Sequence, residues 1–525
     1  MKRALIGAAA AALVASGMAV IASGASASSA SPPGAARADA AGVASASGFI
    51  DEDAFEDVVV GVPGEDVGDK VDAGAIVILY GGEEGFPART QTVNQNGAAG
   101  AAEDGDMFGA AIVVDDFDGD GLDDVAVGAP FEDVGDVVDA GNVTIVYGGV
   151  NGTTGRATPV NQGTVGGAVE AEDHFGQALE AGSWRNDVYG DLAVGAPDED
   201  GGDVVDSGNV TVVYGDALGP GRGGVRVLSQ GSTGVRGEKE AGDHFGFSLQ
   251  KGNYNTLDEF NDLAVGAPGE DAGDVVDSGN VTVVYGNSTA LGSTSDVLRQ
   301  GGGAPETSET GDNFGWSLAA GSFDENAGAT GLAIGVPGES IGSVDQAGKV
   351  TVVYPGLNSI LGGPPSRGFN QNDVGEDIES FDRFGETLTE GIFSLAPYAD
   401  LLVGSPFEDV GAAEDAGVVS ILFGSSRGLT PVGSVTFDQS GLGGVPDAGD
   451  NFGAALAFYF LNGPEDAFGE FAVGAPGENI EGADNAGAVT IHFNDPTPPV
   501  VADTYTQTRS GGLSEQGDLF GAALG

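Results

Sequence analysis

A phenylalanine–glycine pair recurs at nearly constant spacing along the chain and constrains the fold more than any other feature. The pair occurs seven times, at steps of 67 to 70 residues, and its phenylalanines are Phe108, Phe175, Phe245, Phe314, Phe384, Phe452 and Phe520. A Gly-x-Pro tripeptide also occurs seven times, and its first glycines are Gly61, Gly128, Gly195, Gly266, Gly335, Gly404 and Gly474. An aromatic residue follows each of these glycines by 19 positions. A fixed period of this kind is typical of repeat architectures.

Each repeat contains short runs rich in Val, Ile, Leu and Thr, separated by clusters of Gly, Pro and Asp. Examples are VTIVY at 143–147 and VSILF at 419–423, and this pattern indicates strands and turns. Three clear runs and a weaker one, such as 158–162, give four strands in each unit. Seven units of four short strands predict an all-β fold, a seven-bladed β-propeller. A solenoid is the alternative, but a solenoid needs capping ends.

The two ends of the repeat array complement each other. The array starts with the second strand of one unit, at 58–60, and stops after the first strand of another, at 520–524. We therefore expect the C-terminal strand to join the N-terminal blade and close the ring, which leaves no exposed inner edge.

The N-terminal 47 residues differ in composition from the repeats. Lys2 and Arg3 precede an apolar run, and Ala25-Ser26-Ala27 offers a small-x-small cleavage site, so residues 1–27 are predicted to be a secretory signal peptide. Residues 28–47 are rich in Ala, Ser, Gly and Pro and are predicted to be a flexible leader. The propeller is expected to occupy 48–525, and the product to be secreted.

The chain is strongly acidic and lacks cysteine. Eighteen Lys and Arg against 80 Asp and Glu give a formal net charge of −62, which disfavours nucleic acid and anionic lipid as partners and attracts cations. The absence of cysteine excludes disulfides, zinc–thiolate sites and thiol catalysis. We expect no membrane insertion, and a monomer.

The phased Phe-Gly and Gly-x-Pro pairs resemble the FG-GAP repeats of the integrin α-subunit propeller, and the resemblance covers roughly residues 48–525. It implies a seven-bladed propeller in which Phe-Gly opens the innermost strand and Gly-x-Pro closes the second. Phenylalanine can fill the space between blades, whereas glycine permits close approach of backbones.

One Asp-rich loop stands out as a metal site. Asp116, Asp118, Asp120 and Asp124 occupy positions 1, 3, 5 and 9 of the loop, and the Leu122 carbonyl would be a further ligand. Several hard oxygen atoms on a short loop suit Ca²⁺, and the spacing matches the calcium loop of the family. The role expected of the ion is to hold the hairpin together.

The other units depart from this loop pattern. In the third unit Ser183 and Arg185 take the early positions. The N-terminal unit keeps Asp51, Asp53 and Asp57, but Phe49 stands at position 1, so this unit is the weaker metal candidate.

Further acidic residues recur in every unit: an Asp two positions before the Phe, an acid five positions before it, and a Glu four positions after the Gly of Gly-x-Pro. In an up-and-down blade the loops that carry them share one face, opposite the calcium loop, here called the top face. Two interpretations remain open. The carboxylates cap backbone N–H groups, or they pair around additional cations.

No catalytic motif emerges from the sequence. His174 and His244 both precede a Phe-Gly pair, at a position where other units have Met107 or Leu519, which indicates a solvated turn. The hypothesis is an extracellular binding or adhesion module with a protein or glycan partner on the acidic top face. The alternatives are a secreted hydrolase with an active site in the central funnel, or an acidic cation-binding scaffold without a specific partner.

Overall fold

The structure is a computed structural model of the whole chain. It describes residues 48–525 except 84–85, 99, 186, 222, 256–259, 293, 326–328, 357, 395, 462–468 and 494–500. The predicted signal peptide (1–27) and leader (28–47) lie outside the described residues. No helix among the described residues is long and apolar enough to cross a membrane.

The first half of the chain forms four antiparallel sheets. Their strands are β1 (Val58–Val62), β2 (Ala75–Tyr80) and β3 (Arg89–Val93); β4 (Ala111–Asp115), β5 (Asp124–Ala129), β6 (Asn142–Val146) and β7 (Ala157–Val160); β8 (Ala178–Gly182), β9 (Asp191–Ala196), β10 (Asn209–Val213) and β11 (Val225–Leu228); and β12 (Ser248–Gly252), β13 (Asp262–Ala267), β14 (Asn280–Val284) and β15 (Ser295–Gln300). The two-residue strand β16 (Gly303–Ala304) adds in parallel to β15.

The second half forms three more sheets. Their strands are β17 (Leu318–Gly321), β18 (Gly331–Val336), β19 (Lys349–Val353) and β20 (Arg367–Phe369); β21 (Thr387–Gly391), β22 (Asp400–Ser405), β23 (Val418–Phe423) and β24 (Thr430–Phe437); and β25 (Ala455–Tyr459), β26 (Glu470–Ala475), β27 (Ala488–Phe493) and β28 (Val501–Tyr505). The described helices are short: η1 (Gln95–Gly97), α2 (Gln371–Val374) and η2 (Gln439–Leu442).

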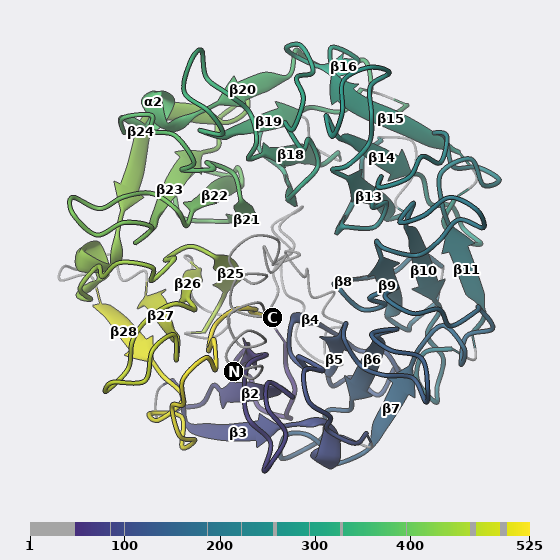
Figure 1. Cartoon of the computed structure of the whole chain (residues 1–525), viewed down its shortest axis with the longest axis vertical. Coiled ribbons are helices and arrows are strands. Elements are labelled where there is room, and N and C mark those ends of the chain that lie inside the picture. Colours follow the sequence, from purple (N-terminus) through teal and green to yellow (C-terminus); the bar gives the residue numbers. More distant parts are fainter. Residues whose placement is uncertain are drawn as a thin grey trace, which may run out of the picture.

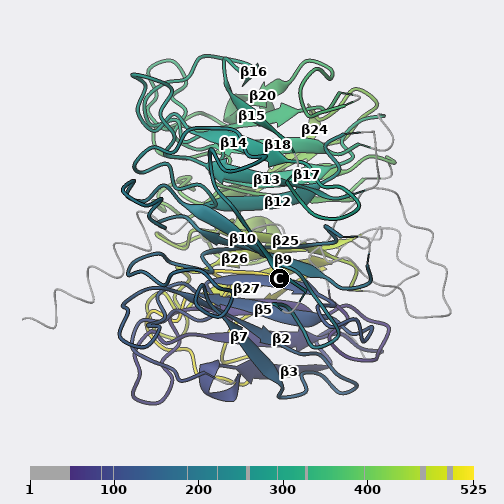
Figure 2. The ribbon, with the colours of Figure 1, turned by 90° about the vertical axis from the view of Figure 1, so that its right-hand side faces the viewer.

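The seven sheets are arranged as blades around a centre, and the ring is seen face-on in Figure 1 and edge-on in Figure 2. The first strand of each blade is innermost, so that β4 contacts β8, β8 contacts β12, and so on around the ring. The prediction of a seven-bladed, all-β propeller is confirmed. We number the blades one to seven from β1–β3.

The ring closes as the sequence predicts. The C-terminal residues supply the innermost strand of blade one: Gly61 N–H donates to Ala523 O (2.8 Å), and Val59 N–H donates to Gly525 O (2.7 Å). The N-terminal blade therefore has four strands, and its inner edge is paired.

The repeated motifs fill the junctions between blades. All seven Phe side chains of the Phe-Gly pairs are fully buried. A Cβ placed on Gly128, in Gly-x-Pro of blade two, would lie 2.2 Å from the carbonyl oxygen of Gly176, in Phe-Gly of blade three. Because any side chain there would collide with backbone, the two motifs recur together.

Candidate functional site

The Asp116 loop connects β4 to β5 in a tight turn. Asp116 Oδ1 accepts hydrogen bonds from the N–H groups of Gly119 (2.6 Å) and Asp120 (3.1 Å), and its Oδ2 accepts one from Gly121 N–H (2.9 Å). Gly119 and Gly121 both have positive φ, 75° and 91°, which glycine adopts without steric cost. The loop is thus wrapped around the Asp116 carboxylate by its own backbone.

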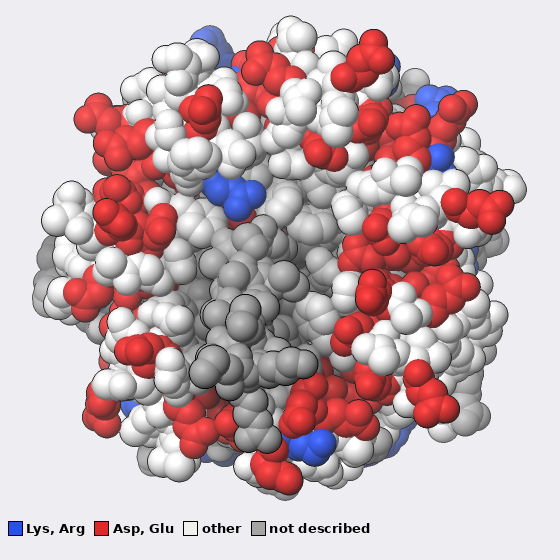
Figure 3. Space-filling model, viewed as in Figure 1, with Lys and Arg blue, Asp and Glu red and all other residues white. Residues whose placement is uncertain are grey.

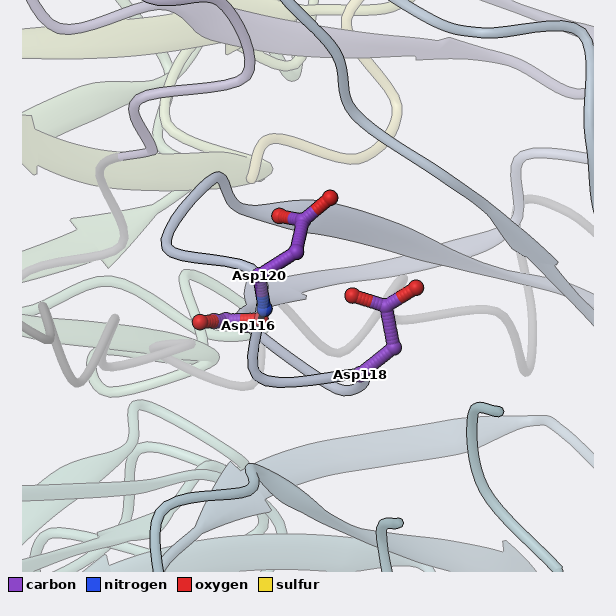
Figure 4. Close-up of side chains that lie close together, drawn as sticks. All are labelled: Asp116, Asp118 and Asp120. Carbon is purple, nitrogen blue, oxygen red and sulfur yellow. Dashed lines mark hydrogen bonds between the residues drawn. The ribbon is translucent and has the colours of Figure 1, made fainter. Parts of the chain in front are cut away.

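Three carboxylates converge in this loop. Asp116, Asp118 and Asp120 each place one oxygen within 4.8 Å of the others, and all three side chains emerge from one short turn (Figure 4). Asp116 is buried and Asp120 is exposed, so the cluster is open to solvent on one side. Like charges this close favour a cation between them, and several carboxylate oxygens on one short loop suit Ca²⁺.

Asp124 and Leu122 are placed differently from the three converging residues. Asp124 Oδ1 accepts from Gly148 N–H (3.0 Å) and its Oδ2 from Phe117 N–H (3.2 Å), and burial raises the pKa of Asp124 to about 9. Leu122 is half-buried, and its N–H donates to Asp120 Oδ1 (3.0 Å). Asp124 therefore links the loop to the connection that directly follows β6.

The acid that opens the second strand of a blade has the same linking role elsewhere. Equivalent pairs of backbone N–H groups donate to Asp57, Asp191, Asp262 and Asp400. This explains why blade six keeps Asp400 although its loop has lost the other ligands, whereas blade five has Gly331 at this position.

The N-terminal loop of blade one also carries three Asp residues, but their carboxylates do not converge. Asp51 pairs with Arg89, with 2.5 Å between Oδ2 and Nη2, and Asp53 Oδ1 caps Phe55 N–H (2.8 Å). Burial raises the pKa of Asp57 to about 8. Within the described part of the chain, three carboxylates lie within 4.8 Å of one another only in the blade-two loop.

In blade three an arginine stands among the loop carboxylates. Arg185 Nη2 lies 3.2 Å from Asp187 Oδ2 and 3.6 Å from Asp191 Oδ1, and the guanidinium lies over the ring of Tyr214. The arginine of blade three belongs to the loop itself, whereas in blade two the positive charge comes from outside the loop, from Arg156 beside Asp118.

The top-face Asp residues cap backbone in every blade. The Asp two positions before each Phe accepts a hydrogen bond from the N–H group three residues earlier. The pairs are Asp106–Glu103, Asp173–Glu170, Asp243–Glu240, Asp312–Glu309, Asp382–Glu379, Asp450–Asp447 and Asp518–Glu515, at 2.5 to 3.0 Å. The geometry of the first interpretation, in which these residues cap turns, is therefore present in all seven blades.

Each recurring Glu of the top face accepts a hydrogen bond from a buried Gln, a contact that was not predicted from the sequence. In every blade a Gln Nε2 donates to this Glu, in the pairs Gln95–Glu132, Gln162–Glu199, Gln230–Glu270, Gln300–Glu339, Gln371–Glu408, Gln439–Glu478 and Gln507–Glu65. All seven Gln residues are buried. Each stands 13 to 15 residues before its Phe, and that spacing was the available signal.

Most recurring Glu residues of the top face have pKa values raised to near neutral pH. Burial, followed by the neighbouring Asp106 carboxylate, raises the pKa of Glu132 to about 8. The pKa values of Glu199 and Glu408 are also raised to about 8, and those of Glu270, Glu339 and Glu478 to about 7. Acidic residues are spread around the ring face in Figure 3.

The two predicted solvated histidines share one carboxylate instead. His174 Nδ1 lies 2.5 Å from Asp198 Oδ2, and His244 Nδ1 lies 2.7 Å from Asp198 Oδ1. The side chains are only partly exposed, 18% for His174 and 36% for His244. Burial alone would raise the pKa of Asp198, but hydrogen bonds from both imidazoles lower it to about 2. The prediction missed this cluster because Asp198 lies in a different loop.

The innermost strands carry buried ionisable groups. Glu180 on β8 is fully buried, and its Oε2 accepts from the backbone N–H of Lys251 on β12 (3.1 Å). Glu390 on β21 is 1% exposed, and burial, with Glu180 nearby, raises its pKa to about 8. Glu390 is thus a buried carboxyl with a raised pKa, the kind of group that a hydrolase site in the central funnel would use.

Comparison with known proteins agrees with this geometry. A family model described as FG-GAP repeat matches residues 108–146. Phosphatidylinositol-glycan-specific phospholipase D of Mus musculus is 30% identical over 159 residues, which is 30% of this chain and 18% of the relative. Integrin alpha-PS2 of Drosophila melanogaster is 32% identical over 240 residues, 44% of this chain and 15% of the relative. The matches thus span less than a fifth of either relative's length.

A solved structure of BBS1N in complex with ARL6DN, soaked with lead, aligns with 73% of this chain and 78% of its own. The TM-score is 0.37 and the identity 12%, and a likeness this weak adds nothing to the assignment.

The blades define the class of protein, a β-propeller of seven four-stranded sheets closed by its C-terminal strand. Within that class, the chain carries an FG-GAP repeat at residues 108–146 and is similar to an integrin α-subunit over 44% of its length.

Proposed function

We propose that this chain is a secreted extracellular binding module whose propeller is stabilised by Ca²⁺ at the Asp116 loop. The observation that carries the proposal is the convergence of Asp116, Asp118 and Asp120 within 4.8 Å. An ion there would be coordinated by three carboxylates of one turn and would hold together the loop between β4 and β5. A ligand that binds only the folded state stabilises it, by about 2.7 kcal/mol at a hundred times the dissociation constant.

The test is calorimetric titration with Ca²⁺ together with thermal unfolding, with and without chelator. One or two tight sites and a higher melting temperature in Ca²⁺ are expected. Asp120→Asn removes a charge from the exposed side of the loop and keeps an oxygen for Leu122 N–H, so it is expected to weaken binding without unfolding the metal-free protein. Asp53→Asn is the matched control in blade one.

Two results would decide against this role. An unchanged melting temperature after chelation would show that the loop is not a stabilising metal site. Many weak sites, unaffected by Asp120→Asn, would favour the acidic cation-binding scaffold.

The acidic top face supplies the proposed partner surface. Its carboxylates recur in all seven blades, and the net charge of −62 favours a partner with basic groups. Integrin α-subunits are among the relatives, which supports adhesion as the context. A pull-down from extracellular material, with and without Ca²⁺, tests for a protein or glycan partner. Secretion is tested by fractionating cells that express the chain with and without residues 1–27.

A hydrolase is the second candidate, and the observation that favours it is the Glu180–Glu390 pair in the inner strands. The raised pKa of Glu390 would let this side chain act as a general acid near neutral pH. Both Glu180 and Glu390 are, however, almost fully buried. Because one relative is a phospholipase D, a phosphatidylinositol-glycan anchor is the substrate to assay. Activity abolished by Glu390→Gln would support the hydrolase, whereas no turnover would exclude it for this substrate.

A further inference from the structure

A polar cleft opens on blade four beside the loop that corresponds to the Asp116 loop. Its volume is about 450 Å³, and Asn255, Tyr285, Thr294 and Asp296 are among the residues that line it. Ligand pockets typically enclose about 300 to 1,000 Å³, so the cleft is large enough for one sugar ring or a comparable group.

In blades one and two this place is filled by an arginine of the chain itself. Arg89 lies over the ring of Tyr80, 3.2 Å from its centroid, and Arg156 lies over Tyr147 at 3.5 Å. Each arginine stands nine residues after its tyrosine. Each arginine also pairs with the carboxylate at position 3 of the loop in its own blade: Arg89 with Asp51, and Arg156 with Asp118.

Blade four lacks both members of that ion pair. Thr294 stands nine residues after Tyr285, and Asn255 takes position 3 of the loop. The backbone register is unchanged, because Tyr285 N–H donates to Thr294 O (3.0 Å) as Tyr147 N–H donates to Arg156 O (3.2 Å). The cleft therefore occupies the volume that the guanidinium takes in blades one and two.

Tyr285 is slightly more exposed than the tyrosines of blades one and two. Tyr285 is 8% exposed, whereas Tyr80 and Tyr147, beneath their arginines, are 0% and 2% exposed. Among the described residues no cation lies over Tyr285. An apolar ring bordered by polar groups favours a ligand with an apolar face and a hydroxylated rim.

The charged groups of the cleft neutralise each other. Asp296 accepts from Arg236 Nη1 (3.2 Å) and from Tyr285 Oη (3.0 Å). The other lining side chains are amides and hydroxyls, including Asn255, Thr294 and Ser359. A ligand with a formal charge would find no matching free counter-charge here, whereas neutral hydroxyl groups can both donate to and accept from these side chains.

We propose that this cleft binds a neutral glycan through one sugar ring, placed against Tyr285 with its hydroxyls on the surrounding amides and hydroxyls. The site is independent of the Asp116 loop and of the top face, so it does not rest on the proposed calcium-dependent function.

The experiment is saturation-transfer NMR on the full chain, with methyl glycosides of glucose, galactose, mannose and N-acetylglucosamine as probes, followed by an array of neutral oligosaccharides. Thr294→Arg would restore the arginine of blades one and two and fill the cleft without removing a core residue. Its matched control is Val432→Arg, nine residues after Phe423 in blade six and 81% exposed, which adds the same charge elsewhere.

We expect at least one neutral probe or array glycan to bind the wild-type chain, at least tenfold weaker binding by Thr294→Arg, and unchanged binding by Val432→Arg. If only array oligosaccharides bind and no monosaccharide does, loss of that oligosaccharide binding in Thr294→Arg would still support the site. The proposal is overturned if no neutral glycan binds or if Thr294→Arg binds as well as wild type. It is also overturned if arginine methyl ester occupies the cleft in preference to every sugar, because the site would then be one for a guanidinium.

Discussion

Arg156 Nη1 lies 2.5 Å from Asp118 Oδ2, so a side chain of the outer part of blade two neutralises one of the three carboxylates of the candidate calcium loop. Arg156 is 43% exposed at its side chain, and ion pairs at such exposure contribute about 0.2 to 1 kcal/mol. The guanidinium therefore competes with Ca²⁺ for Asp118, but only weakly.

Arg156→Gln is expected to tighten Ca²⁺ binding about two- to fivefold, since about 0.4 to 1 kcal/mol corresponds to that ratio. Calorimetric titration at constant ionic strength measures it. Arg89→Gln, the equivalent change in blade one, should leave the affinity of the Asp116 loop unchanged. Weaker binding by Arg156→Gln would mean that the arginine orders the loop instead of competing with the ion.

Acidification from pH 8 to pH 6 is expected to stabilise the metal-free protein. The pKa of Glu132 is about 8 in the folded chain and about 4.3 in an unfolded one, so the folded state binds more protons between these values. The resulting stabilisation is complete below the unfolded-state pKa and is lost as pH rises through the folded-state pKa. Urea unfolding in chelator at several pH values measures the slope.

Glu132→Gln tests the same pH dependence at a single residue. The amide imitates the protonated acid beside Asp106, so the variant should be more stable than wild type at pH 8 and less dependent on pH. Glu52→Gln, at an exposed position, is the control. Stability that falls steadily from pH 8 to pH 6 in wild type would contradict the proposed proton sharing.

Phe520→Ala should destabilise the propeller at the point where the ring closes. Phe520 is fully buried against residues of β1, β2 and β25, and truncation of a buried Phe costs about 3 to 5 kcal/mol. Denaturant unfolding compares it with Leu513→Ala, at a position that is 73% exposed. A cost no larger than that of the control would show that the C-terminal strand is not needed for closure.

Asp198→Asn is expected to lower the pKa of His244. Burial alone would lower that pKa, but hydrogen bonding to Asp198 raises it above the ordinary value, and the variant removes the charge. The chain has three histidines, so NMR titration of the imidazoles can follow each one. His492, whose pKa is lowered by burial within β27, should not change. An unaltered titration of His244 would show that the nearby Asp206 and Asp243 carboxylates are sufficient.

The periodic part of the structure could be predicted from the sequence. The spacing of Phe108 and the later Phe-Gly pairs determines seven blades, because these residues fill the same junction in each repeat. The ring closure follows from the incomplete strand sets at the two ends. The Asp116 loop is also local, since nine consecutive residues contain its carboxylates and the glycines that let it turn.

Only the tertiary structure decided which distant side chains meet. Gln507 binds Glu65 across 442 positions, Arg156 reaches Asp118 across 38, and Asp198 joins two histidines from separate turns. A local pattern fixes backbone geometry and burial, but these partners are set by blade packing around a closed ring. Thus the sequence by itself determined the repeat and its acidic loop, while folding decided which carboxylates are free for a cation, which are neutralised by arginine, and where blade four remains open.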